Sequence, residues 1–396
     1  MRACWSTSRP STSPWTGEGP GAASNGSAHR MPQCGIEANA AGTTLTRRTG
    51  YGMTPRRRNA TLKDVAAAAG VHTSTVSRAL SPDKRTLVNT ETREHIEQVA
   101  KDLHYRPDKV ASSLRRGRTN VIGVIVADLG NPFISPVLRG IENALTGRWV
   151  MQLVVESRDS SDRLARVCEA LVEQRVDAIV TTAARTGDRS TLRRVAEEVP
   201  LVLAVRDMPD LRVATVAHDD VLGGRLAARH LLDLGHSHLG QLVGPDDVSS
   251  FRHRRRGFRD AATDAGLDVL EISDATLLPT VEEGRRLMEL LLREHGDDMP
   301  SAVFVHNDPM AVGALDAARA AGLACPDDLS IVGYNNSALT AYLDPPLTTI
   351  HLPGYELGRL AADTVIGMLD EPGVAPHTVT LPPRLVARAS TAPLSP

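Results

Sequence analysis

Five of the six polar side chains between positions 72 and 78 are expected to be exposed and are of the kinds that bind nucleic acid: His72, Thr73, Ser74, Ser77 and Arg78. Serine and threonine hydroxyls donate to or accept from base edges and phosphates, and an arginine guanidinium binds either a base edge or a phosphate. The types and spacing of these residues therefore indicate contacts with a nucleic acid from one short segment. The competing interpretation is a small helical bundle whose polar side chains are simply solvated.

The residues around this cluster predict two short helices joined by a tight turn. Thr61 and Asp64 have the spacing of a capping box, in which side chains satisfy free N–H groups at a helix start. Gly70 is expected to end that helix because glycine readily adopts a left-handed backbone, and a second helix over residues 73–80 stops before Pro82. Two such helices form a helix-turn-helix, whose second helix lays its first residues in the major groove of DNA.

The net charge of −2 is distributed very unevenly along the chain. Residues 55–118 carry 14 basic and 7 acidic residues, a net charge of +7, whereas residues 119–396 carry 26 and 38, a net charge of −12. A basic block ahead of an acidic body is typical of a nucleic-acid-binding segment attached to a domain that repels nucleic acid. The charge distribution therefore favours nucleic-acid binding over a merely solvated bundle.

Residues 1–58 are rich in Ser, Thr, Gly, Pro and Ala and have no apolar periodicity. This composition predicts a disordered tail. The alternative is that translation begins at Met53, just before the ordered pattern starts.

The remaining composition excludes several classes of protein. The four cysteines are far apart and have no metal-ligand spacing, which predicts a reducing compartment and no zinc site. We expect no other metal and no cofactor. No apolar run approaches the roughly 20 residues of a membrane span, and the N-terminus lacks the pattern of an export signal. We therefore expect a cytoplasmic protein that does not enter a membrane.

Beyond residue 119 short apolar runs alternate with amphipathic stretches of helical period. The runs that predict strands cover residues 121–127, 150–155, 178–180, 201–205, 302–305 and 330–334. Val, Ile and Leu strands that alternate with helices are typical of α/β proteins with parallel sheets covered on both faces, and their number fits two lobes. Ligands in this architecture bind at the carboxyl ends of strands, so we expect a site in a cleft between the lobes.

Residues 61–80, TLKDVAAAAGVHTSTVSRAL, resemble the DNA-binding signature of the lactose/galactose-repressor (LacI/GalR) family of bacterial transcriptional regulators. The resemblance continues towards the C-terminus through landmarks such as DLGNPF at residues 128–133 and PPLTTI at residues 345–350. It implies an N-terminal all-α helix-turn-helix domain followed by a two-lobed α/β domain similar to periplasmic binding proteins. The predicted segments are a tail over residues 1–58, a DNA-binding domain over 59–106, a hinge helix and linker over 107–118, and an effector-binding and dimerisation domain over 119–391.

The resemblance further implies a ligand-responsive repressor of carbohydrate-related genes that binds a pseudo-palindromic operator in double-stranded DNA as a homodimer. The predicted DNA-binding residues are Thr61, His72, Thr73, Ser74, Ser77, Arg78, Tyr105, Ala111 and Leu114. Thr73, Ser74 and Arg78 are expected at bases, with His72 and Ser77 nearer the phosphates. Leu114 is expected to wedge between base steps in the minor groove with Ala111 beside it; the alternative is a linker helix whose leucine rests on the core.

A sugar or sugar derivative is the effector that the resemblance implies between the lobes. The predicted effector-binding residues are Asn131, Phe133, Arg206, Arg252, Asn307 and Asn335. Turn chemistry is the alternative for the asparagines, because asparagine often closes strands through local hydrogen bonds. The two arginines leave a phosphorylated or acidic sugar as an open alternative.

An enzyme or a transport-binding protein on the same two-lobed fold is the rival interpretation. The sequence contains no phosphate-binding glycine loop, nucleophile elbow or metal-ligand cluster. An exported binding protein would also have a signal peptide and no basic head. We therefore expect a regulator and not an enzyme.

Overall fold

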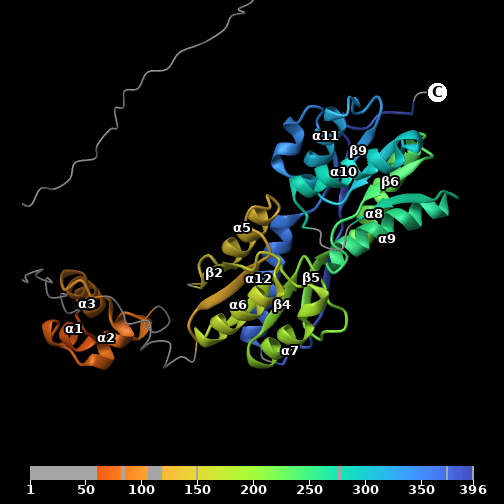
Figure 1. Ribbon diagram of the computed structural model, residues 1–396. Coiled ribbons are helices and arrows are strands. Elements are labelled where there is room, and N and C mark those ends of the chain that lie inside the picture. Colours follow the sequence, from red (N-terminus) through yellow and green to blue (C-terminus); the bar gives the residue numbers. More distant parts are fainter. Residues whose placement is uncertain are drawn as a thin grey trace, which may run out of the picture. The chain divides into compact units, whose positions relative to one another are not determined.

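The computed structural model describes residues 60–81, 85–105, 118–148, 150–273, 278–371 and 373–394. The predicted tail over residues 1–58 and residues 107–117 of the predicted hinge lie outside the described residues, and with them Ala111 and Leu114. The described residues form a helical head and two α/β lobes (Figure 1).

The head contains three helices and a short 3₁₀ helix. Its elements are α1 (Leu62–Ala68), α2 (Thr73–Ala79), the 3₁₀ helix η1 (Arg85–Leu87) and α3 (Thr90–Asp102). The capping box is present: the Thr61 N–H donates to Asp64 Oδ2 at 2.7 Å, and the Asp64 N–H donates to Thr61 Oγ1 at 3.3 Å. Gly70 adopts a φ of 66° where α1 has ended. Val65, Val76 and Ile96 are fully buried where the three helices meet.

Lobe 1 is a parallel six-stranded sheet with the strand order β11-β5-β4-β3-β1-β2. Its strands are β1 (Val121–Val126), β2 (Met151–Glu156), β3 (Ala178–Thr181), β4 (Leu201–Ala204), β5 (Ala214–His218) and β11 (Thr378–Leu381). Its helices are α5 (Ile134–Leu145), α6 (Ser161–Glu173), η2 (Thr186–Asp188), α7 (Arg189–Glu198) and α12 (Gly354–Asp370). Side chains alternate along the strands, so Val124 packs with the α5 and α12 cluster while Ile125 packs with α6 and α7.

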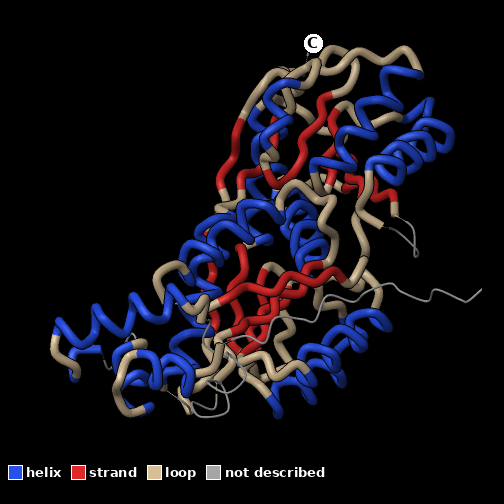
Figure 2. Tube along the Cα trace, turned by 90° about the vertical axis from the view of Figure 1, so that its left-hand side faces the viewer, coloured by secondary structure: helices blue, strands red, loops and turns tan. Residues whose placement is uncertain are grey.

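Lobe 2 repeats this arrangement with the strand order β12-β10-β9-β8-β6-β7, in which only β12 is antiparallel. Its strands are β6 (Leu239–Leu242), β7 (Val269–Ile272), β8 (Ala302–Val305), β9 (Ser330–Asn335), β10 (Thr348–His351) and β12 (Arg384–Val386). Its helices are α8 (Asp220–Asp233), α9 (Ser249–Asp264), α10 (Val281–His295), η3 (Gly296–Asp298), α11 (Asp308–Ala320) and η4 (Ala338–Tyr342). Helices flank the strands of both lobes, as Figure 2 shows. The sequence correctly predicted parallel sheets covered by helices.

The chain passes between the lobes three times. Residue 219 joins β5 to α8, residues 352–353 join β10 to α12, and residues 382–383 join β11 to β12. Each lobe is therefore assembled from separate stretches of the chain, and these three short connections are where a rotation of one lobe against the other would bend the backbone.

Helices α5 and α12 pack at unusually close range on lobe 1 because each contributes a glycine to the contact. A Cβ atom added at Gly358 would lie 2.0 Å from the carbonyl oxygen of Val137, and one added at Gly140 would lie 2.0 Å from that of Tyr355. No side chain fits at either position. The two glycines therefore fix how closely the helices cover the sheet.

Candidate functional site

The polar face of α2 carries the residues that the sequence predicted at DNA. His72, Ser74 and Arg78 are exposed, and Thr73 and Ser77 are half-buried. His72 is also the N-cap of α2, since its Nδ1 atom accepts the Ser74 N–H at 3.2 Å. The opposite face of this helix is buried in the head, so its polar face is the one available to a partner.

Two other predicted DNA-binding residues have local structural roles in the head. The Thr61 hydroxyl donates to Asp64 Oδ2 at 2.8 Å within the capping box. Tyr105 is half-buried and packs against the apolar core of the head.

A cleft lies between the lobes at the carboxyl ends of strands from both sheets. Its lining residues are Ala127, Asp128, Asn131, Phe133, Ile134, Asp159, Thr182, Val205, Arg206, Ser250, Phe251, Arg254, Pro279, Asn307 and Asn335. The cavity volume is about 50 Å³, which is room for only a few water molecules at ~10–15 Å³ each. The lobes are therefore nearly closed on each other, and they must separate to admit a larger ligand.

Arg206 reaches the cleft from lobe 1 as part of an ion pair. Its Nη1 atom lies 2.6 Å from Asp159 Oδ1, and both side chains are less than one-tenth exposed. Arg185 also approaches the same carboxylate oxygen, at 3.3 Å. The charge of Arg206 is therefore already compensated by a neighbouring carboxylate.

Arg254 reaches the base of the cleft from lobe 2 and is held on several sides. Its Nε atom donates to Asp220 Oδ1 at 2.9 Å, and Nη1 donates to the His306 carbonyl at 2.7 Å. The Tyr334 hydroxyl donates to the same Asp220 oxygen at 2.8 Å, and the centroid of the Tyr334 ring lies 3.9 Å from Arg254 Cζ. Burial raises the pKa of Asp220, while Arg254 and Tyr334 act in the opposite direction by stabilising the carboxylate.

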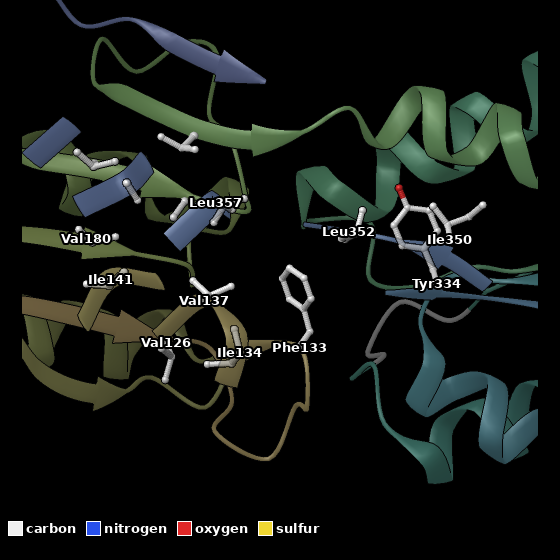
Figure 3. Close-up of a cluster of buried hydrophobic side chains, with 14 of the residues drawn as sticks. Val126, Phe133, Ile134, Val137, Ile141, Val180, Tyr334, Ile350, Leu352 and Leu357 are labelled. Atoms are coloured by element: carbon white, nitrogen blue, oxygen red, sulfur yellow. The ribbon is translucent and has the colours of Figure 1, made fainter. Parts of the chain in front are cut away.

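Two phenylalanines are among the apolar residues that line the cleft, Phe133 of lobe 1 and Phe251 of lobe 2. Figure 3 shows Phe133 with Ile134 and Val137 on one side and Leu352 and Tyr334 on the other. Aromatic rings at the edge of a polar cavity suit the apolar faces of sugar rings.

Two residues of the cleft hold a backbone conformation that L-amino acids rarely adopt. Val205 has a φ of 70° and Asn335 a φ of 116°. For a β-branched residue such as valine this is a true outlier, and such strain is concentrated at ligand sites where surrounding structure enforces it. Val205 directly follows β4 and Asn335 is the last residue of β9, two strands whose ends form the cleft.

Asn131 and Asn307 have local hydrogen bonds as well as a place in the lining. Asn131 Oδ1 accepts the Phe133 N–H at 3.1 Å. Asn307 caps α11 by accepting the Met310 N–H at 2.8 Å, and its amide donates to the Pro279 carbonyl at 3.0 Å. The turn chemistry considered as an alternative is therefore present at both positions, and these local hydrogen bonds do not use every amide N–H of the two side chains.

Comparison with known proteins extends the likeness over the whole described chain. Residues 61–108 match the family model described as bacterial regulatory proteins, lacI family, and residues 228–391 match that of the periplasmic binding protein-like domain. The HTH-type transcriptional regulator DegA of Bacillus subtilis (strain 168) is 33% identical over 338 residues, which cover 85% of this chain and 99% of DegA. The ribose operon repressor of Escherichia coli (strain K12) is 34% identical over 334 residues, 84% of this chain and 99% of the relative.

This chain belongs to the LacI family of bacterial regulatory proteins. The solved structure of the lac repressor dimer bound to operator and the anti-inducer ONPF has a TM-score of 0.75 and 27% identity, over 85% of this chain and 100% of that one. The LacI-family fold predicted from the sequence, a helix-turn-helix domain with a two-lobed domain like periplasmic binding proteins, is confirmed. These relatives are transcriptional regulators, so the enzyme interpretation is not favoured.

Five of the six residues predicted to bind an effector in this LacI-family chain line the cleft, namely Asn131, Phe133, Arg206, Asn307 and Asn335. The structure corrects the prediction for the sixth residue, Arg252. It lies outside the cleft lining, and its guanidinium donates instead to Thr186 Oγ1 at 2.8 Å and to the Asp246 carbonyl at 3.0 Å.

Arg254 occupies the cleft position that was assigned to Arg252. It stands three residues after Phe251 and four before Phe258, and all three are on the buried face of α9. Arg252 lies two residues away and hence on another side of the helix. The spacing of Arg254 from the two phenylalanines is the signal that identifies it.

Contacts between the lobes continue outside the cleft in a group that we call the lobe bridge: Arg185 and Thr186 of lobe 1 with Asp247 and Arg252 of lobe 2. Arg185 donates to both carboxylate oxygens of Asp247 at 2.7 Å. The Thr186 N–H donates to the Asp247 carbonyl at 2.9 Å, and Thr186 Oγ1 accepts from Arg252. The bridge holds the lobes together at the edge of the closed cleft.

The described helices are too short or too polar to cross a membrane. Within the same residues, no three His, Cys, Asp or Glu side chains are grouped in a way that would hold a metal ion.

Proposed function

We propose that this LacI-family chain acts as a homodimeric repressor that binds a pseudo-palindromic operator through α2 and senses a neutral sugar or sugar derivative in the cleft. One recognition helix reads too few base pairs to define a site, whereas a twofold pair reads two half-sites at fixed spacing. The lac repressor is a dimer on its operator in the solved structure. We place the protein in the cytoplasm, where its operator is found.

The base contacts are assigned to Thr73, Ser74 and Arg78, and the phosphate contacts to His72 and Ser77. The exposure of one polar face on α2, with the other face buried in the head, supports this assignment. A helix in the major groove must present its side chains in this way.

Four further DNA-binding residues remain proposals at the edge of this interface. Thr61 and Tyr105 are proposed to approach the phosphates from the head. Leu114 is proposed as the minor-groove wedge, with Ala111 packed beside it. An operator affinity that stays unchanged in Leu114→Ala would remove that role.

A neutral effector is favoured because both arginines of the cleft are held by carboxylates, Arg206 by Asp159 and Arg254 by Asp220. An anionic ligand would have to compete with these pairs and would also meet the carboxylate of Asp128 in the lining. Sugar hydroxyls, in contrast, can bond to amides and to carboxylate–guanidinium pairs without displacing either partner. The pairing of both arginines with carboxylates therefore favours a neutral sugar over the phosphorylated or acidic sugar that the sequence left open.

Ligand binding would act on DNA by changing the relative position of the lobes. The cleft is nearly closed, so a sugar that enters it alters the lobe contacts and, through them, the pairing of two heads in the dimer. Such a coupling between sites is typically ~1–3 kcal/mol.

Calorimetric titration of the full chain with neutral pentoses and hexoses, and with their phosphates, tests the ligand class. We expect at least one neutral sugar to bind, and Phe133→Leu to weaken it at least tenfold because the leucine removes the ring but keeps an apolar side chain. Leu129→Ala is the matched control, since Leu129 is in the same loop and half exposed. Binding of a sugar phosphate more tightly than its neutral parent, in a way that Phe133→Leu weakens and that therefore belongs to the cleft, would contradict the proposal.

A further inference from the structure

A second hollow lies outside the cleft, on the solvent side of α9. It has a cavity volume of about 360 Å³, and its lining residues are Asp246, Arg252, His253, Arg255, Arg256 and Arg259. The four arginines stand at the i, i+3, i+4 and i+7 positions of one helix, so they share one face. The hollow has more room than the closed cleft and is open to solvent, so a ligand can enter it without movement of the lobes.

The positive charge in this hollow is only partly compensated. Arg255 donates to Glu271 Oε2 at 2.7 Å through Nε and lies 3.5 Å from Asp246 through Nη1, and Arg259 is 3.9 Å from Glu271. Arg256 is exposed and forms no ion pair with any described residue. Four arginines thus face two carboxylates, which leaves a local net charge of about +2 and attracts multiply charged anions.

The Arg252 guanidinium has two nitrogen atoms, Nε and Nη2, that could donate to a ligand in the hollow. Both of its hydrogen bonds come from Nη1, to Thr186 Oγ1 at 2.8 Å and to the Asp246 carbonyl at 3.0 Å. Its Nε and Nη2 atoms have no acceptor among the described residues. These two atoms form the edge of the guanidinium that binds two oxygens of one phosphate side by side.

We propose that this hollow is a binding site for the phosphate or diphosphate group of a small metabolite, held by the Nε–Nη2 edge of Arg252 and by Arg256 and Arg259. A bound phosphate fixes the Arg252 side chain in the rotamer whose Nη1 atom bonds Thr186 of lobe 1 and Asp246 of lobe 2. Occupation of the hollow therefore stabilises the lobe bridge and favours the closed cleft.

A nucleic acid is a poorer match for this surface than a small anion. The site is concave and includes the carboxylate of Asp246, with Glu271 beside it. It also belongs to a part of the chain, residues 119–396, whose net charge of −12 repels a long polyanion.

Binding of pyrophosphate to the full chain, measured by calorimetry at constant ionic strength, tests the site. We expect Arg256→Gln combined with Arg259→Gln to weaken pyrophosphate binding at least tenfold. Arg212→Gln combined with Arg293→Gln is the control, because it removes two exposed arginines elsewhere and should change the affinity less than twofold. Equal weakening in both double variants, or none in the first, would overturn the proposal.

Two further measurements test which class of ligand the hollow binds and whether its occupation stabilises the lobe bridge. Duplex DNA of random sequence should not displace pyrophosphate, and displacement would assign the hollow to a nucleic acid instead. Hydrogen exchange at the Thr186 amide, which donates across the lobe bridge, should slow when pyrophosphate binds; unchanged exchange would refute the coupling. None of these experiments uses a sugar or an operator, so their failure leaves the proposed function standing.

Discussion

Arg254 and Asp220 form a buried ion pair at the base of the cleft, with Nε and Oδ1 2.9 Å apart and side chains only 4% and 2% exposed. Asp220 is the first residue of α8, directly after one of the three connections between the lobes. The pair therefore joins the ligand cleft to a point where the backbone passes from one lobe to the other. A ligand that contacts Arg254 acts next to that connection.

Arg254→Met should lower the free energy of unfolding by about 3–5 kcal/mol, because it leaves the Asp220 carboxylate buried without its cation. Urea unfolding followed by circular dichroism measures this loss. Arg285→Met is the matched control: its partner Asp316 and Arg285 itself are about half exposed, and such pairs contribute ~0–1 kcal/mol. Similar losses in the two variants would show that the burial of the first pair has no energetic consequence.

The stability of the protein should fall as the pH decreases below about 6.5, in part through His218. Burial lowers the pKa of His218 to about 3, and the nearby Arg254 guanidinium acts in the same direction. Between pH 3 and 6.5 the unfolded chain binds a proton at this residue that the folded chain does not, so acid favours unfolding. The stabilisation of the folded protein that comes from keeping His218 neutral is complete above pH 6.5 and is lost progressively as the pH falls towards 3.

His218→Gln should therefore make the dependence of unfolding free energy on pH shallower between pH 6 and 4, by up to ~1.4 kcal/mol per pH unit. His377→Gln, at an exposed position before β11, is the control and should leave the slope as in the parent. Parallel curves for the parent and His218→Gln would contradict the assignment.

Two glycines of α12 should respond in opposite ways to alanine. Gly358→Ala places a Cβ atom 2.0 Å from the Val137 carbonyl oxygen, and we expect a loss of ~1–3 kcal/mol or more from overpacking. Gly367 has no atom within 4 Å of an added Cβ, so Gly367→Ala should stabilise the same helix by ~0.5–1 kcal/mol. Thermal or urea unfolding of the two variants measures both effects, and a loss at both positions would show that the close contact is not the cause.

Local determinants explain which elements the sequence could predict. The capping box depends on Thr61 and Asp64, three residues apart, and on nothing distant. Strands β1, β3, β8 and β9 are nearly or wholly buried and have continuous apolar runs. Six described strands lack such runs and were not predicted: β7, β11 and β12 lie at sheet edges, and the buried β5, β6 and β10 contain polar residues such as Thr215, Gln241 and Thr349.

The cleft could be predicted in outline because strand ends in an α/β lobe are marked by polar residues such as Asn131 and Asn335. The likeness to the family motif does not by itself separate Arg252 from Arg254, whereas the helical spacing of Arg254 from Phe251 and Phe258 puts it on the buried face of α9. The pairing of Arg206 with Asp159 also required the fold, since these residues follow β4 and β2, two strands that are separated in the sheet by β3 and β1.

Selection of duplexes from a random DNA library with the full chain, followed by titration of the selected sequence at about 150 mM salt, shows whether the protein recognises a twofold operator through α2. We expect an inverted repeat with two half-sites, bound at least tenfold more weakly by Arg78→Ala and equally well by Arg293→Ala on lobe 2. Binding without any sequence preference, or an Arg78→Ala variant with full affinity for the selected sequence, would contradict it.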